Sequence, residues 1–163
     1  MVYFSLGSND GNRNELLNFA LKVIDTWSES FVQVSSWFYS RSLYDVSQPD
    51  YINLTVGIKT NYGPFNILTL CQNLEVQLGR KRNSKVPRVQ RTLDIDIIAY
   101  DQLLVHTPTL ILPHPLATER EFVLRPLCEL AGNETHPRWG STWNSYLKVL
   151  RSQGLSKIEK QII

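Results

Sequence analysis

Hydrophobic and polar positions along the chain follow two periods in turn, and their order predicts a mixed α+β fold. Short apolar runs at residues 2–6 and 31–39 are typical of strands. Residues 51–59 alternate, with Ile52, Leu54, Val56 and Ile58 on one face and Tyr51, Asn53, Thr55 and Lys59 on the other. A fourth strand is predicted where a branched apolar run continues from Asp94 to residue 100.

Two segments with helical periodicity separate these strands. Asn12 and Glu15 have the spacing of a capping box, with asparagine in the hydroxyl role, and open a helix. Its apolar face consists of Leu17, Ala20, Leu21, Ile24 and Trp27. Gly63 and Pro64 open a second helix, which Gly79 ends. Beyond residue 100 we expect a hairpin or edge strand at 102–105 and helices at 119–131 and 142–151.

The order βαββαβ is that of a ferredoxin-like core, in which two helices cover one face of an antiparallel sheet. This arrangement predicts that the other face stays free, with extra helices at the C-terminal end. The sequence has no internal repeat, low-complexity tract or linker. Residues 1–163 are therefore expected to form a single domain.

Composition places the chain among ordinary soluble globular proteins, with 42% hydrophobic and 20% charged residues. The net charge of +2 hides a local excess, because residues 80–91 contain six cations and no acid. These cations are Arg80, Lys81, Arg82, Lys85, Arg88 and Arg91. Without them the chain would carry 11 basic and 15 acidic residues. A local cluster of this kind indicates an anionic ligand rather than general attraction to nucleic acid; the alternative is a solvated loop without a ligand.

Several classes of site are excluded or disfavoured by pattern. No P-loop and no Gly-x-Gly-x-x-Gly motif occurs, which argues against the common nucleotide cradles. Cys71 and Cys128 form no Cys-x-x-Cys pair, and the histidines lack zinc-ligand spacing. The chain begins without a basic and apolar signal and contains no apolar run of membrane-spanning length. We therefore expect free thiols in a reducing cytoplasm.

Residues 91–96, Arg-Thr-Leu-Asp-Ile-Asp, carry the strongest chemical signal. On a strand, Asp94 and Asp96 point to the same face about 6.6 Å apart, whereas Ile95 and Ile97 point to the opposite face. Paired carboxylates beside a cationic segment can hold Mg²⁺ and polyphosphate together. The alternative is a pair of exposed aspartates bridged to neighbouring arginines.

Three other positions allow either a ligand or a structural interpretation. Asn53 can hydrogen-bond to the edge of a heterocycle and Tyr51 can stack on it, or the two can form a cross-strand pair on a solvated face. Phe122 can contact a ligand or belong to the core. His114, between two prolines, can contact phosphate or cap its turn.

Taken together, six segments resemble the 6-hydroxymethyl-7,8-dihydropterin pyrophosphokinase family of folate biosynthesis. They are residues 5–9, 48–53, 75–82, 91–96, 112–115 and 120–127. The resemblance implies a ferredoxin-like fold and transfer of pyrophosphate from ATP to the pterin hydroxymethyl group, with release of AMP. It also implies a cytoplasmic monomer that binds neither nucleic acid nor membrane.

The resemblance further assigns roles to individual residues. Asp94 and Asp96 would bind two Mg²⁺ ions that bridge the ATP phosphates, and together with Arg82 and Arg91 they would be the catalytic residues. The ATP-binding residues would be Gln72, Glu75, Arg80, Arg82, Arg91, Ile97, His114 and Arg120. The pterin-binding residues would be Leu43, Tyr51, Asn53 and Phe122.

Two loops depart from the family pattern. Residues 88–90 read Arg-Val-Gln where family members usually carry Trp-Gly-Pro, so a lid aromatic is missing. The loop after Tyr39 lacks the usual proline and glycine and is shortened. Since lid motions often limit turnover, these departures predict weaker pterin affinity or slower closure.

Two rival functions follow from the same residues. A ferredoxin-like sheet with aromatics on its open face can stack the bases of single-stranded RNA, with the basic loop along the backbone. The altered loops also allow a paralogue that binds nucleotide or pterin without turnover. Salt-titrated RNA binding tests the first rival, and AMP release that depends on the pterin separates the enzyme from an inert binder.

Overall fold

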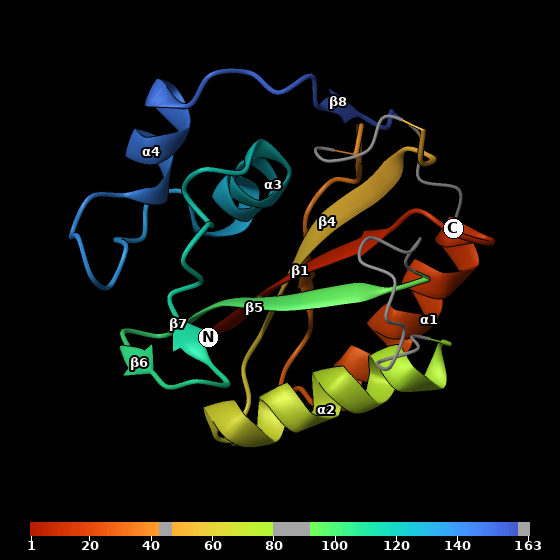
Figure 1. Ribbon diagram of the computed structural model, residues 1–163. Coiled ribbons are helices and arrows are strands. Elements are labelled where there is room, and N and C mark those ends of the chain that lie inside the picture. The colour runs from red at the N-terminus through yellow and green to blue at the C-terminus, as the bar shows by residue number, and fades with distance from the viewer. Residues whose placement is uncertain (43–46, 80–91, 160–163) are drawn as a thin grey trace.

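An antiparallel sheet forms the centre of the fold (Figure 1). The computed structural model describes residues 1–42, 47–79 and 92–159. In chain order the elements are β1 (Val2–Ser8), α1 (Arg13–Asp25), β2 (Gln33–Val34), β3 (Phe38–Ser40), β4 (Tyr51–Ile58), α2 (Pro64–Gln77), β5 (Asp94–Tyr100), β6 (Val105–His106), β7 (Ile111–Leu112), α3 (Glu121–Ala131), α4 (Trp143–Val149) and β8 (Ser156–Lys157).

The strands of the main sheet lie in the order β5-β1-β4-β3-β8, and β2 also pairs with β4. All of these pairings are antiparallel. The order places β1 and β4 in the interior and β5 at an edge. The predicted ferredoxin-like βαββαβ core, with α1 and α2 on one face, is therefore confirmed.

Local sequence signals account for the ends of both core helices. The Asn12 side chain accepts a hydrogen bond from the Glu15 backbone N–H, which caps α1 as predicted. Pro64 occupies the first turn of α2, where its missing N–H costs nothing. Gly79 follows the helix with a φ of 97°, a conformation that side-chain-bearing residues rarely adopt.

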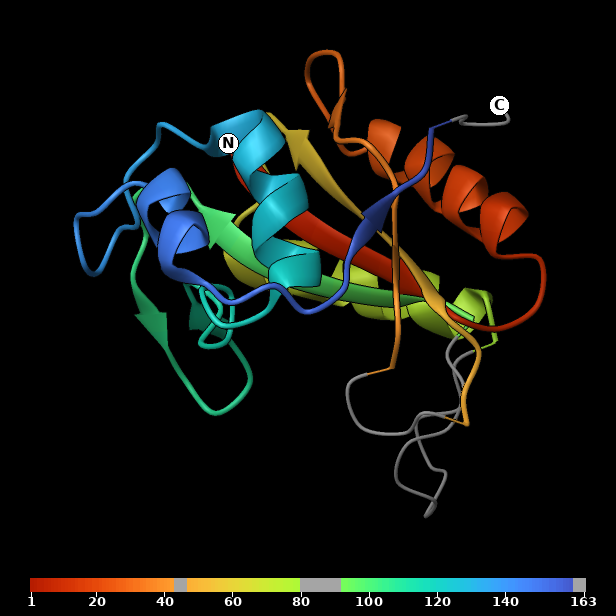
Figure 2. The ribbon, with the colours of Figure 1, turned by 90° about the horizontal axis from the view of Figure 1, so that it is seen from above.

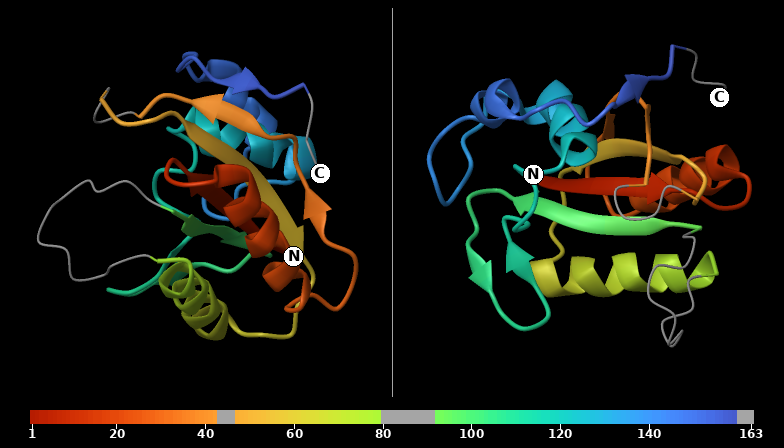
Figure 3. Two further views of the ribbon diagram at one scale, coloured as in Figure 1. Left: turned by 90° about the vertical axis from the view of Figure 1, so that its right-hand side faces the viewer. Right: turned by 45° about the horizontal axis from the view of Figure 1, so that its top comes forward.

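The main core lies between the sheet and these two helices, which form one layer in Figure 3. Its fully buried members include the apolar face of β4, as the alternation predicted. Leu17, Ile24 and Ile67 project from the helices onto that face and have no exposed surface. Apolar burial of this kind is the main stabilising contribution to such a fold.

The opposite face of the sheet is not free, and that part of the sequence prediction is wrong. Helix α3 packs on it, and Val123, Leu124 and Leu127 form a second core with Tyr3 and Ala99. Figure 3 shows α3 and α4 on the side of the sheet away from α1 and α2. The same sheet face therefore carries polar site residues and an apolar contact with α3. The alternation of residues along a strand does not show which part of the face a helix will cover.

Residues 31–39 do not form one strand as predicted, because β2 and β3 are separated by residues 35–37. Ser35 explains the interruption. Its backbone N–H donates to Thr55 O, and its hydroxyl accepts a hydrogen bond from the Thr55 N–H at 2.8 Å. A serine side chain thus replaces a backbone acceptor and breaks the regular ladder.

The C-terminal third adds smaller elements. Strands β6 and β7 form a hairpin that lies further along the chain than the predicted residues 102–105 and shares only Val105 with them. Helix α3 accommodates Pro126, and Thr142 caps α4 by accepting from the Ser145 N–H. Strand β8, which pairs with β3, has no sequence signal that predicted it. Across the described ranges, no helix combines the length and apolar character needed to cross a bilayer.

Candidate active site

A row of side chains crosses the sheet on the face that α3 partly covers. Asp94 on β5 pairs with Gly7 on β1, Gly7 pairs with Asn53 on β4, and Asn53 pairs with Phe38 on β3. Directly paired residues in an antiparallel sheet point to the same face. The register therefore brings the predicted metal-binding and pterin-binding residues together, although they come from separate parts of the chain.

Gly7 leaves an open position between Asp94 and Asn53. A Cβ atom at Gly7 would lie 3.3 Å from Asn53 Oδ1 and 3.7 Å from Tyr51 Cδ1. A side chain at this position would therefore press against both predicted pterin contacts. The sequence prediction did not name Gly7 as a site residue, but a glycine inside a strand is itself a signal of close approach by another group.

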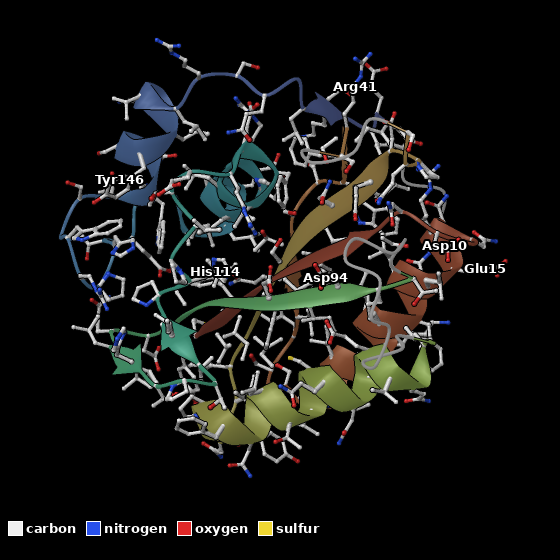
Figure 4. All side chains as sticks on the ribbon, in the orientation of Figure 1. Asp10, Glu15, Arg41, Asp94, His114 and Tyr146 are labelled. Atoms are coloured by element: carbon white, nitrogen blue, oxygen red, sulfur yellow. The ribbon has the colours of Figure 1, made fainter. Side chains whose placement is uncertain are left out.

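The two aspartates take the alternating positions that the sequence predicted. Asp94 and Asp96 are partly exposed, whereas Ile95 and Ile97 are 7% and 5% exposed and belong to the main core. In Figure 4, Asp94 on β5 and His114, which follows β7, both lie on the side of β5 that faces α3. Both carboxylates thus reach solvent from a rigid strand, as a ligand site requires.

His114 stands beside this pair. Its backbone N–H donates to Ile98 O at 2.8 Å, and its Nδ1 accepts from the Leu116 N–H at 3.1 Å. The remaining ring nitrogen, Nε2, lies 4.0 Å from Asp96 Oδ2. Burial lowers the pKa of His114, the Asp96 carboxylate acts in the opposite direction, and Arg120 lowers it again. In its neutral form the ring thus directs an N–H toward the acidic pair.

The first turn of α3 supplies Arg120 and Phe122. Arg120 is the N-cap residue of the helix, and its guanidinium carbon lies 5.8 Å from the centre of the Phe122 ring. Its charge also acts on His114, so it faces the same region. Phe122 is partly buried against the second core rather than enclosed in it. The Arg120 cation therefore lies near His114, with the Phe122 ring beside it.

Asn53 is held in one orientation by its neighbour on β3. Its Nδ2 donates to Ser40 Oγ at 2.9 Å, and the residue is 2% exposed. Its Oδ1 is the atom nearest to the open position at Gly7. Tyr51, two residues earlier on the same face, is partly exposed. Ser40 is thus a further site residue that the sequence prediction missed, because only the register reveals it.

The predicted nucleotide contacts on α2 lie at the outer edge of β5. The buried carboxylate of Glu75 accepts the Ile95 N–H at 2.9 Å and so holds α2 against this edge. Ile97 lies two residues further, so its backbone groups point to the same edge while its side chain is in the core. Gln72 lies on α2, one turn before Glu75, and is partly exposed.

The remaining predicted site residues lie outside the described residues. They are Leu43, Arg80, Arg82 and Arg91. The whole cationic segment at 80–91, with the altered positions 88–90, belongs to the same undescribed ranges, as does part of the shortened loop after Tyr39.

The donor set fits Mg²⁺ rather than a metal enclosed by protein ligands. Within residues 1–42, 47–79 and 92–159, no group of three or more His, Cys, Asp or Glu side chains is arranged to hold a metal. Asp94 and Asp96 alone would share the ion with other oxygen donors. Mg²⁺ is commonly bound by one or two carboxylates, with phosphate and water completing its coordination.

Known proteins resemble this chain in both sequence and fold. Residues 3–132 match the sequence model of the family described as 7,8-dihydro-6-hydroxymethylpterin-pyrophosphokinase (HPPK). The 2-amino-4-hydroxy-6-hydroxymethyldihydropteridine pyrophosphokinase of Bacillus subtilis is 37% identical over 131 residues, which cover 80% of this chain and 77% of the relative. The Haemophilus influenzae protein of the same name is also 37% identical, covering 83% of this chain and 84% of the relative.

Other relatives are much longer. The folic acid synthesis protein fol1 of Pneumocystis carinii is 33% identical over 91% of this chain, which spans only 20% of that protein. A crystal structure of HPPK-DHPS from Plasmodium falciparum superposes with a TM-score of 0.71 at 15% identity, covering 90% of this chain and 43% of that one. This structural likeness supports the fold alone.

Proposed function

The chain belongs to the 7,8-dihydro-6-hydroxymethylpterin-pyrophosphokinase family, and on that basis we propose that it transfers pyrophosphate from ATP to 6-hydroxymethyl-7,8-dihydropterin and releases AMP. The proposal makes it an ATP-dependent transferase of folate biosynthesis. It acts as one pyrophosphokinase domain, whether alone or within a longer protein.

One observation carries the proposal. The register of β5, β1 and β4 puts Asp94 and Asn53 on either side of Gly7, on one face of the sheet. Asp94, proposed for the metal and phosphates, and Asn53, proposed for the pterin, are therefore adjacent. No side chain lies between them, because the residue that separates them is Gly7. Two substrates that must exchange a group need this kind of adjacency.

The nucleotide binds at the β5 end of the row. Asp94 and Asp96 would hold two Mg²⁺ ions together with the ATP, and bound Mg²⁺ would supply positive charge that offsets the charge of the phosphates. His114 donates a hydrogen bond from Nε2, and the Arg120 guanidinium offers a planar fork to phosphate oxygens. Backbone groups of Ile97 at the strand edge face the base, with Gln72 and Glu75 beside it.

The pterin binds at the β4 end of the row. Asn53, fixed by Ser40, presents its amide oxygen to the donor edge of the ring. Tyr51 and Phe122 stack on the two faces of the ring, and Leu43 adds an apolar contact.

In the reaction, the pterin hydroxyl oxygen attacks the β-phosphorus of ATP and forms a new P–O bond. The bond from the β-phosphorus to the oxygen that bridges it to the α-phosphate breaks, AMP departs with that oxygen, and the hydroxyl proton is released. The protein places the two substrates in line and stabilises the charge, which can lower a barrier by about 7–11 kcal/mol. Arg82 and Arg91 are proposed to hold the transferred phosphates.

The proposal also includes a cytoplasmic monomer that binds neither nucleic acid nor membrane. ATP and reduced thiols such as Cys71 and Cys128 are both expected in the cytoplasm. A single-stranded RNA-binding module would need an open sheet face for base stacking, and α3 covers much of that face. The remaining alternative is a family member that binds its ligands without turnover.

Measurement of AMP release by the purified chain tests the proposal. ATP is supplied with and without 6-hydroxymethyl-7,8-dihydropterin, in Mg²⁺ or in EDTA. We expect AMP only when both the pterin and Mg²⁺ are present. Binding of ATP or pterin with no AMP under any condition would identify an inert binder, and ADP as the product would exclude pyrophosphate transfer.

A further inference from the structure

The N-terminal turn of α3 has no cap of its own. Its N-cap residue is Arg120, whose side chain has no acceptor atom and makes no capping hydrogen bond. The first N–H groups of a helix need acceptors from elsewhere. One acceptor comes from a distant segment, because the Glu121 N–H donates to Gln153 Oε1 at 2.9 Å. The turn that carries Arg120 and Phe122 is thus completed by residue 153.

Residues 152–158, here called the C-terminal strap, run beside α3 and end in β8 (Figure 2). They lie beyond residue 132, where the match to the family ends. The Glu121 carboxylate holds the strap, since it accepts hydrogen bonds from the Gln153 N–H and the Ser152 hydroxyl. Gln153 Nε2 in turn donates to Glu119 O at 2.8 Å. Backbone and side chain of Gln153 therefore both bind the start of α3.

Glu121 is an acceptor in its ionised form. The residue is 2% exposed, and its Oε1 also accepts hydrogen bonds from Arg125 Nη2 at 2.7 Å and Nε at 3.0 Å. Burial by itself would raise the pKa of Glu121, but hydrogen bonds from the Gln153 backbone and Arg125 outweigh it and lower the pKa. An acidic residue in a first helical turn also interacts favourably with the helix dipole.

An open groove of about 470 Å³ lies between the strap and the middle of α3, and both polar and apolar side chains line it, among them Arg125, Cys128 and Leu155. The strap is held at both of its ends. One end is the Glu121 cluster, and the other is the pairing of β8 with β3, where Lys157 Nζ contacts Glu129 Oε1 at 3.0 Å. Hydrogen bonds and charge hold the strap at Glu121, whereas at β8 its position also depends on Ile158, which packs against the main core.

We propose that Gln153 of the C-terminal strap is a positioning residue: held by the Glu121 carboxylate, its side chain fixes the first α3 turn so that Arg120 and Phe122 meet the substrates. The roles of Arg120 and Phe122 in this statement rest on the proposed function. Gln153 itself touches neither substrate. Loss of the clamp leaves the helix folded through its apolar face but frees its first turn.

The test compares two variants of the full chain, each of which removes one attachment of the same segment. Gln153→Ala removes the side-chain bonds to the start of α3, and Lys157→Ala removes the contact with Glu129 at the other end. Both residues are exposed, so each variant should fold, with similarly small changes in unfolding temperature. Amide exchange at Glu121 by NMR and the dissociation constants for the pterin and a non-hydrolysable Mg·ATP analogue are measured for both.

In Gln153→Ala we expect exchange of the Glu121 amide to accelerate about tenfold or more, since its acceptor is gone. The pterin dissociation constant should rise about fivefold to tenfold, because the two side-chain hydrogen bonds that order this turn are lost. Lys157→Ala should leave both quantities within about twofold of wild type. A merely structural role would change the unfolding temperature of both variants without this difference in affinity.

Two results would overturn the proposal. The first is a Gln153→Ala chain with a protected Glu121 amide and wild-type affinities, and the second is an equal loss of affinity in Lys157→Ala. A wild-type chain that bound neither ligand would contradict the proposed function instead. The amide exchange comparison would still decide whether the clamp exists.

Discussion

Four alternating residues, Asp94, Ile95, Asp96 and Ile97, both anchor β5 in the core and present carboxylates to the site. The isoleucines fill the main core while the aspartates face the site, so the strand is anchored by the same pattern that presents its carboxylates. A slip of one residue would exchange the two sets, which the burial of the isoleucines prevents. This coupling explains why the sequence alone predicted the direction of both carboxylates.

Replacing either aspartate tests its assignment to the metal. Asp94→Ala and Asp96→Ala should each lower the rate of AMP formation by about 10³-fold or more, the scale expected when a group that stabilises charge in transfer is removed. The fold should persist, since both side chains are partly exposed. Asp25→Ala, an exposed aspartate at the end of α1, is the control. Near-normal turnover in either site variant would remove the two-metal assignment.

Gly7 shows what sequence could not predict at this scale. Its importance comes from a register partner 46 residues away, since only the pairing with Asn53 reveals that a side chain would obstruct the site. Ser40 is similar, because its hydrogen bond to Asn53 depends on β3 lying beside β4. Contacts across strands are set by the fold and leave no local motif.

Gly7→Ala tests the open position directly. The added methyl group would approach Asn53 Oδ1 more closely than an ordinary contact, so Asn53 must shift. Pterin affinity should fall about tenfold, or ~1.4 kcal/mol, with a smaller change for nucleotide, both measured by calorimetry. Gly63→Ala meets only an ordinary contact with Asn66 and should bind the pterin like wild type. Unchanged affinity in Gly7→Ala would show that the pterin lies elsewhere.

Among the elements, those with local signals agree best with the sequence prediction. Capping at Asn12 and the break at Gly79 set the ends of α1 and α2. Elements that depend on distant partners were missed, because β8 has only two residues and exists through its pairing with β3. The covering of the sheet by α3 was likewise unpredictable, since an amphipathic helix does not specify which face it will cover.

The segment between α3 and α4 contains a histidine, His136, whose pKa is lowered by burial. His136 is 3% exposed and stacks on Trp139 with ring centres 4.3 Å apart. Its Nδ1 accepts the Arg138 N–H at 3.2 Å. Burial, with a smaller contribution from the Arg138 charge, lowers the pKa of His136 from its ordinary value of 6.5. Between its folded pKa and 6.5, His136 is therefore mostly neutral in the folded chain and mostly protonated in the unfolded chain.

This histidine predicts a specific loss of stability in acid. Its contribution is complete above about pH 6.5 and declines as pH falls toward its lower folded pKa, because protonation then favours the unfolded state. In His136→Asn, which keeps a side-chain acceptor but cannot titrate, the unfolding temperature should fall less steeply between about pH 7 and 5. His106→Asn, in the exposed hairpin, is the control. An equal flattening in both variants would contradict the assignment to His136.

At the scale of the whole molecule, the site lies between the sheet and the first turn of α3. The sheet provides the polar row, β5 and the hairpin that leads to His114 close one side, and the first turn of α3 closes another (Figure 1). Helices α1 and α2 pack on the other face of the sheet, and Glu75 of α2 also bonds to the outer edge of β5. A rigid platform with substrate contacts on its loops and helix ends is the usual division between scaffold and site.

The identity of the heterocycle was predicted from the family resemblance and not from physical patterns in the sequence. Charge pattern and strand periodicity predicted an anion-binding and metal-binding region, but not which heterocycle lies beside it. Conversely, the structure adds the Gly7 opening, the orientation of Asn53 by Ser40 and the clamp at Glu121. These features depend on pairings between distant segments, which no motif records.

The most direct measurement is a crystal structure of this chain with Mg²⁺, a non-hydrolysable ATP analogue and the pterin. We predict metal ions between the triphosphate and both Asp94 and Asp96, with the pterin ring between Tyr51 and Phe122 and its hydroxymethyl group over Gly7. Bare aspartates, with the triphosphate bound away from β5, would contradict the account at its centre.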